Sequence, residues 1–314
     1  MFINSTGYYI PEKRIDNQYL AQINDSTEDW YVKRTGIITR ARANEGETVN
    51  YMCIEAVKSA IKNLPYDIHE VDLIIFGSYT PSDTISTTAH VIQKEFNIDK
   101  AKAFYISSAC SSAVNGMEII KSFFETNISK RALLVCADQN SQYSNDHDRE
   151  SGHLWGDAAV ALFFSNEEIS SNDSKVIDVI TRGLGNIGKG PDGITLNPKV
   201  GIQMLYGKDV FTNACIYMSE FTKYIIKKNN YTIDDLSYFI GHQANKRIIS
   251  FVCNELGICE SKSLTNIETL GNTGCASAPL VLAQNYDNFK SNDLICLSVF
   301  GGGYSSGTCL IRKG

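Results

Sequence analysis

The chain has 314 residues, of which 43% are hydrophobic and 20% charged, and its net charge is −6. These are values of an ordinary globular protein, large enough for two domains or one large α/β unit, and they exclude disordered and collagen-like classes. The acidic balance argues against nucleic acid as the main partner, because no strongly basic stretch is present to neutralise phosphates.

Targeting and cysteine patterns point to the cytoplasm. No apolar run approaches the roughly 20 residues that a membrane-spanning helix needs, and the N-terminal residues 1–14 are polar where a signal peptide would be apolar. We therefore expect no membrane association. The nine cysteines are odd in number and form no C-x-x-C pair, so the sequence gives no sign of a disulfide framework or of a zinc site. Most should be small buried side chains.

The predicted elements of the first half alternate between helices and strands. A helix at 55–63 is followed by an acidic pair and a buried strand that ends near residue 77. After a strand that ends near Ile106, small residues at 107–113 turn into a helix with apolar positions at 113, 117, 120 and 124. Apolar strands at 132–137 and, after a glycine turn, in the segment 155–164 complete this half.

The second half repeats this order at an offset of 165 residues. Residues 232–242 align with 67–77, and residues 272–278 align with 107–113, so that Cys275 falls on Cys110. The matched order of elements predicts two similar α/β halves, each a sheet covered by helices.

The boundary between the halves is expected where the sequence is polar and rich in turn-forming residues, at 165–178. This gives an N-terminal half of residues 1–170 and a C-terminal half of residues 171–314.

Cys110 stands in the turn between a strand and a helix. At a helix N-terminus, unpaired N–H groups and the macrodipole favour a thiolate, so this position suits a nucleophile. The alternative is a buried, inert cysteine, which is the default for any one of nine. Only Cys110 and Cys275 occupy such a turn.

His242 and Asn272 are the other candidate catalytic residues. His242 follows an apolar strand at its carboxyl end, where the functional loops of α/β proteins lie, although it could also be a structural cap. Asn272 lies between two glycines, and it is either a turn residue or an amide donor for a developing oxyanion. The repeat places both loops in the same half.

Two other motifs lack the context that they need. Residues 183–188 fit G-x-G-x-x-G, but Pro191 and Gly193 follow where a helix must begin. Residues 303–307 fit G-x-S-x-G, but no histidine follows His242, as a serine hydrolase would require.

Taken together, the sequence motifs resemble the 3-oxoacyl-[acyl carrier protein] synthase III family of the thiolase superfamily, along nearly the whole sequence. In order they are GYYIPEKRIDN (7–17), WYVKRTGI (30–37), the Cys110 turn, Arg149 with WGD (155–157), GKDVF (207–211), HQANKR (242–247), GNTG (271–274) and FGGGYSSG (300–307). The resemblance implies a thiolase-like duplicated α/β fold with α-β-α-β-α layers, in a homodimer.

The resemblance also implies the chemistry of the site. Cys110 would take an acyl group from an acyl thioester, while His242 and Asn272 hold the carbonyl of a malonyl-type thioester that loses CO₂. The backbone N–H groups of Cys110 and Gly302 would form the oxyanion hole. The implied reaction needs no metal and no redox cofactor, because coenzyme A and acyl carrier protein thioesters are its substrates.

Substrate recognition is implied in the same way. Trp30 and Arg149 resemble the residues that sandwich the adenine of coenzyme A, with Arg34 near the mouth of that pocket. The segment formed by Gln243, Ala244, Asn245, Lys246 and Arg247 resembles the docking site for acyl carrier protein. Its two cations would suit an acidic carrier.

Three departures from the family pattern are visible. Residues 110–114 read Cys-Ser-Ser-Ala-Val where the family has C-[SA]-G-F, residues 84–90 replace a stretch with Phe-Pro, and residues 156–161 replace G-D-G-A-G-A. The first two predict an enlarged acyl pocket that accepts medium-chain donors.

Two alternative functions stay open. One is an acyltransferase of a specialised pathway that passes the acyl group to a hydroxyl or an amine. The other is a non-catalytic synthase subunit, against which the intact Cys–His–Asn set counts.

Overall fold

The computed structural model describes all residues from 1 to 314. The first half contains β1 (Phe2–Tyr9), β2 (Arg14–Asp16), α1 (Asn17–Asn24), α2 (Glu28–Thr35), β3 (Thr39–Ala41), α3 (Val49–Ile61), β4 (Leu73–Gly77), α4 (Thr88–Glu95), β5 (Lys102–Ile106), α5 (Ser112–Glu125), β6 (Arg131–Gln139) and β7 (Asp157–Ser165). The second half contains β8 (Ser174–Gly183), β9 (Thr195–Asn197), β10 (Gly201–Gln203), α6 (Gly207–Lys228), β11 (Tyr238–Gly241), α7 (Lys246–Leu256), α8 (Ile267–Leu270), α9 (Ser277–Asn285), β12 (Leu294–Gly301) and β13 (Ser305–Arg312).

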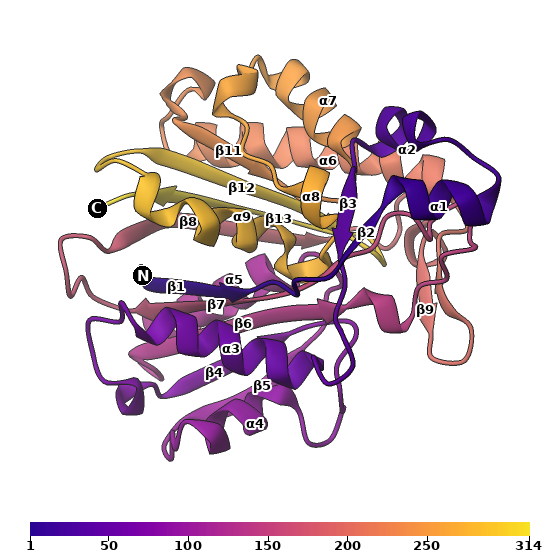
Figure 1. Cartoon of the computed structure of the whole chain (residues 1–314). Coiled ribbons are helices and arrows are strands. Elements are labelled where there is room, and N and C mark those ends of the chain that lie inside the picture. Colours follow the sequence, from indigo (N-terminus) through magenta and orange to yellow (C-terminus); the bar gives the residue numbers. More distant parts are fainter.

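Nine strands are hydrogen-bonded in the order β11-β12-β13-β8-β1-β7-β6-β4-β5. The two halves meet between β1 and β8, which share only the pairs Phe2↔Lys175 and Ile3↔Ser174. Figure 1 shows α6 and α7 outside the strands of the second half, α3 and α4 outside those of the first, and α5 and α9 between them. The predicted order of layers, α-β-α-β-α, is therefore present.

Side-chain alternation along the strands builds these layers. On β4, Leu73 and Ile75 point into the central core that α5 and α9 share, whereas Ile74 and Phe76 point into the outer core with α3. Successive residues of a strand face opposite sides of the sheet, so a continuous apolar run can serve two cores at once.

The internal repeat predicted from the sequence is visible in the structure. Short 3₁₀ turns at Ile68–Glu70 and Ile233–Asp235 both begin with a capping box and are 165 residues apart. At the same offset, α5 begins at Ser112 and α9 at Ser277. Within the nine-stranded sheet, β5 lacks a full counterpart, and in the second half it is reduced to the bridge Phe239↔Ser263. The predicted division at residue 170 falls between β7 and β8 and stays a prediction.

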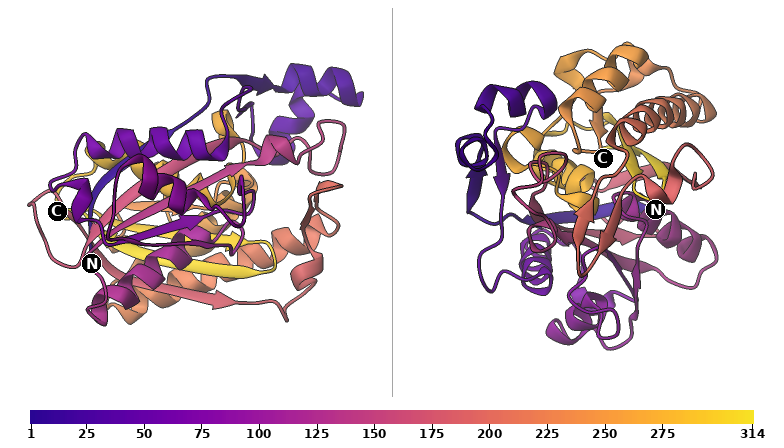
Figure 2. Two further views of the ribbon diagram at one scale, coloured as in Figure 1. Left: turned by 90° about the horizontal axis from the view of Figure 1, so that it is seen from below. Right: turned by 90° about the vertical axis from the view of Figure 1, so that its right-hand side faces the viewer.

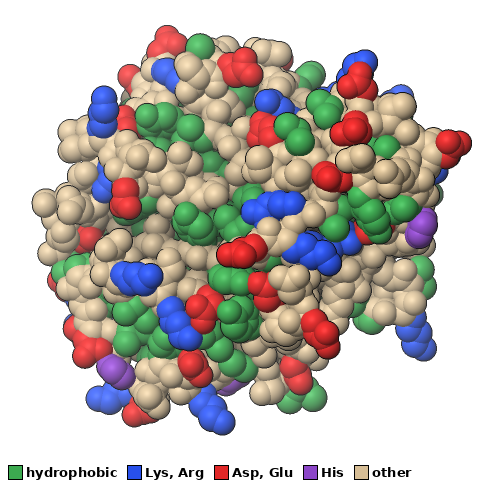
Figure 3. Space-filling view, viewed as in Figure 1, with side chains coloured by type: hydrophobic (Ala, Val, Ile, Leu, Met, Phe, Trp, Pro, Cys, Tyr) green, Lys and Arg blue, Asp and Glu red, His purple; other side chains and the backbone are tan.

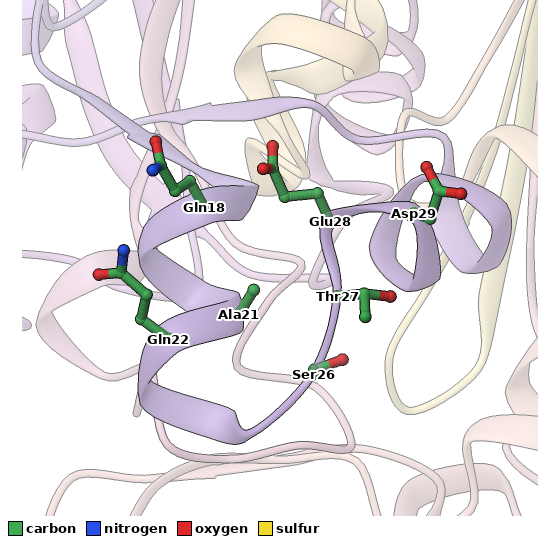
Figure 4. Close-up of a pocket in the computed structure, with 7 residues that line it drawn as sticks. All are labelled: Gln18, Ala21, Gln22, Ser26, Thr27, Glu28 and Asp29. Atoms are coloured by element: carbon green, nitrogen blue, oxygen red, sulfur yellow. The ribbon is translucent and has the colours of Figure 1, made fainter.

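Smaller elements lie beyond one end of the nine-stranded sheet. There, α1 and α2, the β2–β3 ribbon and the β9–β10 hairpin lie together, opposite to the N- and C-termini (Figures 1 and 2). A hollow of about 550 Å³ between α1 and α2, drawn in Figure 4, contains none of the predicted site residues. On the face in Figure 3, acidic and basic side chains are interspersed. None of the helices combines the length and apolar composition that crossing a membrane requires.

Asp138, near the end of β6, ties the two halves together. Its buried carboxylate accepts hydrogen bonds from the hydroxyls of Ser78 and Thr80 (3.0 Å each) and from the N–H of Tyr79 (2.9 Å), all in the loop after β4. The other oxygen accepts the N–H of Cys275 from the second half at 2.8 Å. Burial raises the pKa of Asp138, and these donors oppose that shift.

Gly274→Ala tests how tightly this carboxylate is packed. Gly274 has a φ of +64°, and a Cβ there would collide with Oδ2 of Asp138. Gly257 is a matched control, because its φ is +71° and a Cβ there would meet nothing within 4 Å. Each alanine costs about 1–2 kcal/mol for the left-handed backbone.

We expect Gly274→Ala to lower the free energy of unfolding by about 2 kcal/mol more than Gly257→Ala, because it also displaces buried hydrogen bonds. Urea unfolding of both variants measures the difference. Equal losses would show that the contact with Asp138 is not tight.

Candidate active site

Residues that follow the carboxyl ends of five strands are the candidates for one site. Tyr79 follows β4, Cys110 follows β5, Asn140 follows β6, His242 follows β11 and Gly302 follows β12. Both halves of the molecule contribute. The carboxyl ends of parallel strands are where α/β proteins assemble ligand sites, because several loops meet there.

The turn that carries Cys110 is strained. Ala109 has a φ of +49°, a left-handed conformation that is uncommon for a residue other than glycine. The hydroxyl of Ser112 supports the turn by donating to the Ala109 carbonyl (2.7 Å) and accepting the N–H of Ser108 (2.8 Å). Gly301 lets the end of β12 approach, since a Cβ there would lie 3.0 Å from the backbone nitrogen of Cys110. Such strain is typical of functional turns.

Burial of the sulfur raises the pKa of Cys110 to about 12, and the carboxylate of Asp138 adds to this effect. The N–H groups of Gly302 and Cys110, and the nearby hydroxyl of Tyr79, lower the pKa and so act in the opposite direction. We expected the helix N-terminus to favour a thiolate, but desolvation outweighs the donors, so the thiol is protonated at neutral pH. The two N–H groups are those predicted for the oxyanion hole.

His242 is held neutral and oriented. It is 5% exposed, and burial lowers its pKa to about 4. Its backbone N–H donates to the Ser298 carbonyl at 2.8 Å, and its ring Nδ1 lies 2.6 Å from the hydroxyl oxygen of Ser277. The hydroxyl can hold either tautomer of the ring and leaves Nε2 for a substrate. Ser277 was not predicted, because its helix begins 35 residues later in the sequence.

Asn272 occupies a turn, and the nitrogen of its side-chain amide remains available as a hydrogen-bond donor. Its Oδ1 accepts the N–H of Gly274 at 3.0 Å, which leaves Nδ2 as a donor. Its backbone bridges to the first half, because its N–H donates to Leu154 (2.8 Å) and its carbonyl accepts from Gly156 (2.9 Å). The turn role is thus observed, and the donor role stays a prediction.

Asn140 and Tyr79 are site residues that the sequence did not reveal. The Nδ2 of Asn140 donates to the carbonyls of Gly156 (2.7 Å) and Asn272 (3.1 Å), and its Oδ1 accepts the Tyr79 hydroxyl at 2.6 Å. Through these contacts, Cys110 and Asn272 are linked by way of Tyr79 and Asn140. Their one sequence signal is their position just after a buried strand.

The residues predicted to bind coenzyme A are placed unequally. The guanidinium of Arg34 lies over the Trp30 ring, 4.9 Å from its centroid. Arg149 is exposed, and its neighbour Glu150 pairs with Arg34 at 3.6 Å. The structure thus brings Trp30 together with Arg34, and the sandwich of the adenine by Trp30 and Arg149 stays a prediction.

A cavity of about 680 Å³ opens beside Arg34. Arg34, Lys208 and Arg247 line it with positive charge, against one carboxylate from Glu150, and Phe211 supplies an apolar wall. This balance suits an anionic ligand that also has an apolar part.

The segment predicted to dock a carrier protein is only partly available. Gln243 is fully buried, and its amide bonds the Gly241 carbonyl and the N–H of Asn266, so it cannot touch a carrier, and its inclusion was wrong. Ala244 is half-buried, and Asn245 caps α7 by accepting the N–H of Arg247 at 2.9 Å. Lys246 pairs with Glu268 at 2.8 Å. Arg247 is exposed and stacks over Phe211 at 5.6 Å.

The substitutions that predicted an enlarged acyl pocket do not leave open space in the first turn of α5. Ser112 packs on Gly77, where a Cβ would lie 3.1 Å from it, and Val114 packs on Gly307, where a Cβ would lie 2.8 Å from it. In the other segment, Ile85 is 89% exposed. The smaller side chains are compensated by close packing, so they give no physical reason to expect medium-chain donors.

Comparisons with known proteins agree with this geometry. Residues 104–183 and 226–313 match family models described as 3-oxoacyl-[acyl-carrier-protein] synthase III and its C-terminal part. A beta-ketoacyl-[acyl-carrier-protein] synthase III from Staphylococcus saprophyticus is 32% identical over 99% of this chain and 98% of its own.

Solved structures extend the comparison to the fold. The 3-oxoacyl-[acyl-carrier-protein] synthase III of Aquifex aeolicus superposes with a TM-score of 0.92 at 30% identity, over 99% of both proteins. The priming beta-ketosynthase of the R1128 polyketide pathway superposes with a TM-score of 0.90 at 26% identity, over 99% of this chain and 96% of its own. The predicted thiolase-like duplicated fold is confirmed. The chain belongs to the 3-oxoacyl-[acyl-carrier-protein] synthase III family and is a condensing enzyme that forms carbon–carbon bonds by acyl transfer.

Proposed function

We propose that the enzyme loads an acyl group onto Cys110 and condenses it with a malonyl-type thioester, with loss of CO₂. The observation that carries the proposal is the pair of backbone N–H groups, from Cys110 and from Gly302 of the other half, that reach the Cys110 sulfur. Two more donors, on His242 and Asn272, carry no charge of their own, and we assign them to the same site. Such a set suits negative charge that develops on a carbonyl oxygen.

In the first half-reaction the sulfur of Cys110 attacks the carbonyl carbon of an acyl-coenzyme A. The bond to the coenzyme A sulfur breaks, and the proton that Cys110 loses ends on that leaving sulfur. The carbonyl oxygen accepts the N–H groups of Cys110 and Gly302 while it bears negative charge.

In the second half-reaction the malonyl-type carboxylate leaves as CO₂, and its bonding electrons form an enolate. The Ser277 hydroxyl donates to Nδ1 of the neutral His242, which keeps the proton on Nε2 for the enolate oxygen. The Nδ2 of Asn272 is the second donor. The enolate carbon then attacks the acyl carbonyl, and Cys110 leaves as a thiolate and recovers a proton.

The binding of both substrates fits the cavity beside Arg34. Its cations Arg34 and Lys208 suit the phosphates of coenzyme A, and the exposed Arg247 suits an acidic carrier protein. All nine cysteines are unpaired, which supports a reducing compartment such as the cytoplasm. A homodimer is proposed on the family resemblance alone.

The two half-reactions can be separated by mutation. We expect His242→Ala and Asn272→Ala to accept the acyl group on Cys110 but to release CO₂ about 100- to 1000-fold more slowly, because each lacks a donor to the enolate oxygen. Intact-mass measurement with peptide mapping follows the acyl group, and labelled malonyl thioester follows CO₂.

The exposed Cys259 provides the control, since Cys259→Ala should change neither step and Cys110→Ala should abolish loading. Loss of loading with normal CO₂ release in the His242 or Asn272 variants would contradict the assignment. Turnover onto a hydroxyl or an amine without CO₂ would identify an acyltransferase instead.

The pH dependence of decarboxylation tests the state of His242. Its pKa of about 4 keeps the ring neutral down to pH 5.5, whereas a histidine with an ordinary pKa near 6.5 would be about nine-tenths protonated there. CO₂ release by enzyme already acylated on Cys110 should therefore change less than two-fold between pH 7.5 and 5.5. A roughly ten-fold loss following one ionisation near 6.5 would show that the ring is not buried as described.

Carrier recognition is tested at Arg247, the free cation of the docking segment. Arg247→Glu should lower kcat/KM for carrier-protein substrates much more than for the matching coenzyme A thioesters, and the gap should narrow in high salt. Lys62→Glu, exposed in the region of the C-terminus, is the control and should affect neither. Equal losses for the two substrate forms would place the docking surface elsewhere.

A further inference from the structure

Tyr79 is fixed at its backbone, its ring and its hydroxyl. Its N–H donates to Asp138 at 2.9 Å, and its ring packs on the apolar cluster that contains Leu154 and Trp155. Its hydroxyl donates to Oδ1 of Asn140 at 2.6 Å. A side chain held at every rotatable part cannot swing aside when a ligand arrives, so it acts as a rigid wall.

The partner of the hydroxyl is itself fixed. Both hydrogens of the Asn140 amide are taken by the carbonyls of Gly156 (2.7 Å) and Asn272 (3.1 Å), which settles the orientation of the amide. Its Oδ1 must then face Tyr79. The phenol and the amide satisfy one another, so neither has a free hydrogen to attract a polar acyl group.

The same hydroxyl lies near the Cys110 sulfur, while its one hydrogen is donated to Asn140. An acyl group on that sulfur places its oxygen toward the N–H groups of Cys110 and Gly302, and its hydrocarbon tail must leave in another direction. On the side of α5, Ser112 and Val114 already pack against the backbone of Gly77 and Gly307. The Tyr79 ring therefore takes up space beside the sulfur that an acyl tail would otherwise use.

We propose that Tyr79 is a specificity-determining residue that restricts the acyl group on Cys110 to short chains. The inference rests on the proposed function, because it requires that Cys110 carries an acyl group. It replaces the sequence-based expectation of medium-chain donors.

The test measures kcat/KM for loading of Cys110 from acetyl-, butyryl-, hexanoyl- and octanoyl-coenzyme A, by intact mass. The wild-type enzyme should lose activity from butyryl onward. Tyr79→Ala should raise the ratio of octanoyl to acetyl loading at least 100-fold, since burying one methylene is worth about 0.8 kcal/mol, or roughly four-fold. Tyr79→Phe keeps the ring but loses the hydrogen bond to Asn140, so it should raise this ratio about three-fold, far less than Tyr79→Ala.

Asn140→Ala is the second variant, because it keeps the ring but removes its anchor. It should raise the ratio of octanoyl to acetyl loading at least three-fold. If Tyr79→Ala does not fold, this variant tests the role of the Tyr79 ring. A wild-type preference for octanoyl, or an unchanged profile in the folded Tyr79→Ala, would overturn the role of Tyr79. If no thioester loads Cys110 in any of these proteins, it is the proposed function that fails.

Discussion

The structure depends on the buried carboxylate of Asp138. A buried charge is tolerated only when it is surrounded by donors, and here the donors come from the loop after β4 and from the turn at Cys275 in the other half. Satisfying one carboxylate therefore fixes where both loops lie. The hydrogen bonds to Asp138 therefore set the positions of Tyr79 and of the turn that starts at Asn272.

Burial keeps the two reactive groups uncharged at rest. It raises the pKa of Cys110 and lowers that of His242, so neither ionises at neutral pH by itself. The site instead contains neutral donors directed at places where negative charge appears only during reaction, first on the sulfur and the acyl oxygen, then on the enolate. Donors that are already in position need no reorganisation when that charge develops, which is how such sites lower a barrier.

The sequence predicted what local pattern and duplication can encode. The offset of 165 located both strand-to-helix turns, and the motifs pointed to Cys110, His242, Asn272 and Gly302. It could not predict contacts between distant loops. The bonds of Asn140 and Ser277 join residues 132 and 35 positions apart, and no periodicity records them. The family resemblance placed Gln243 in the docking segment, yet its amide satisfies backbone groups in the core.

The duplication also explains why one of the two equivalent cysteines is inert. Register places Ile74 of β4 beside Leu133 of β6, and its equivalent Phe239 beside Cys296 of β12, so Gly301 is the counterpart of Asp138. The carboxylate of Asp138 takes the N–H of Cys275, whose thiol donates to the Gly77 carbonyl at 3.2 Å. At Gly301 there is no side chain, although a Cβ would reach within 3.0 Å of the Cys110 nitrogen. The N–H of Cys110 is therefore left for the substrate. At equivalent positions of the two halves, Asp138 therefore binds the N–H of Cys275 and holds that turn in place, whereas Gly301 leaves the N–H of Cys110 available for an oxyanion.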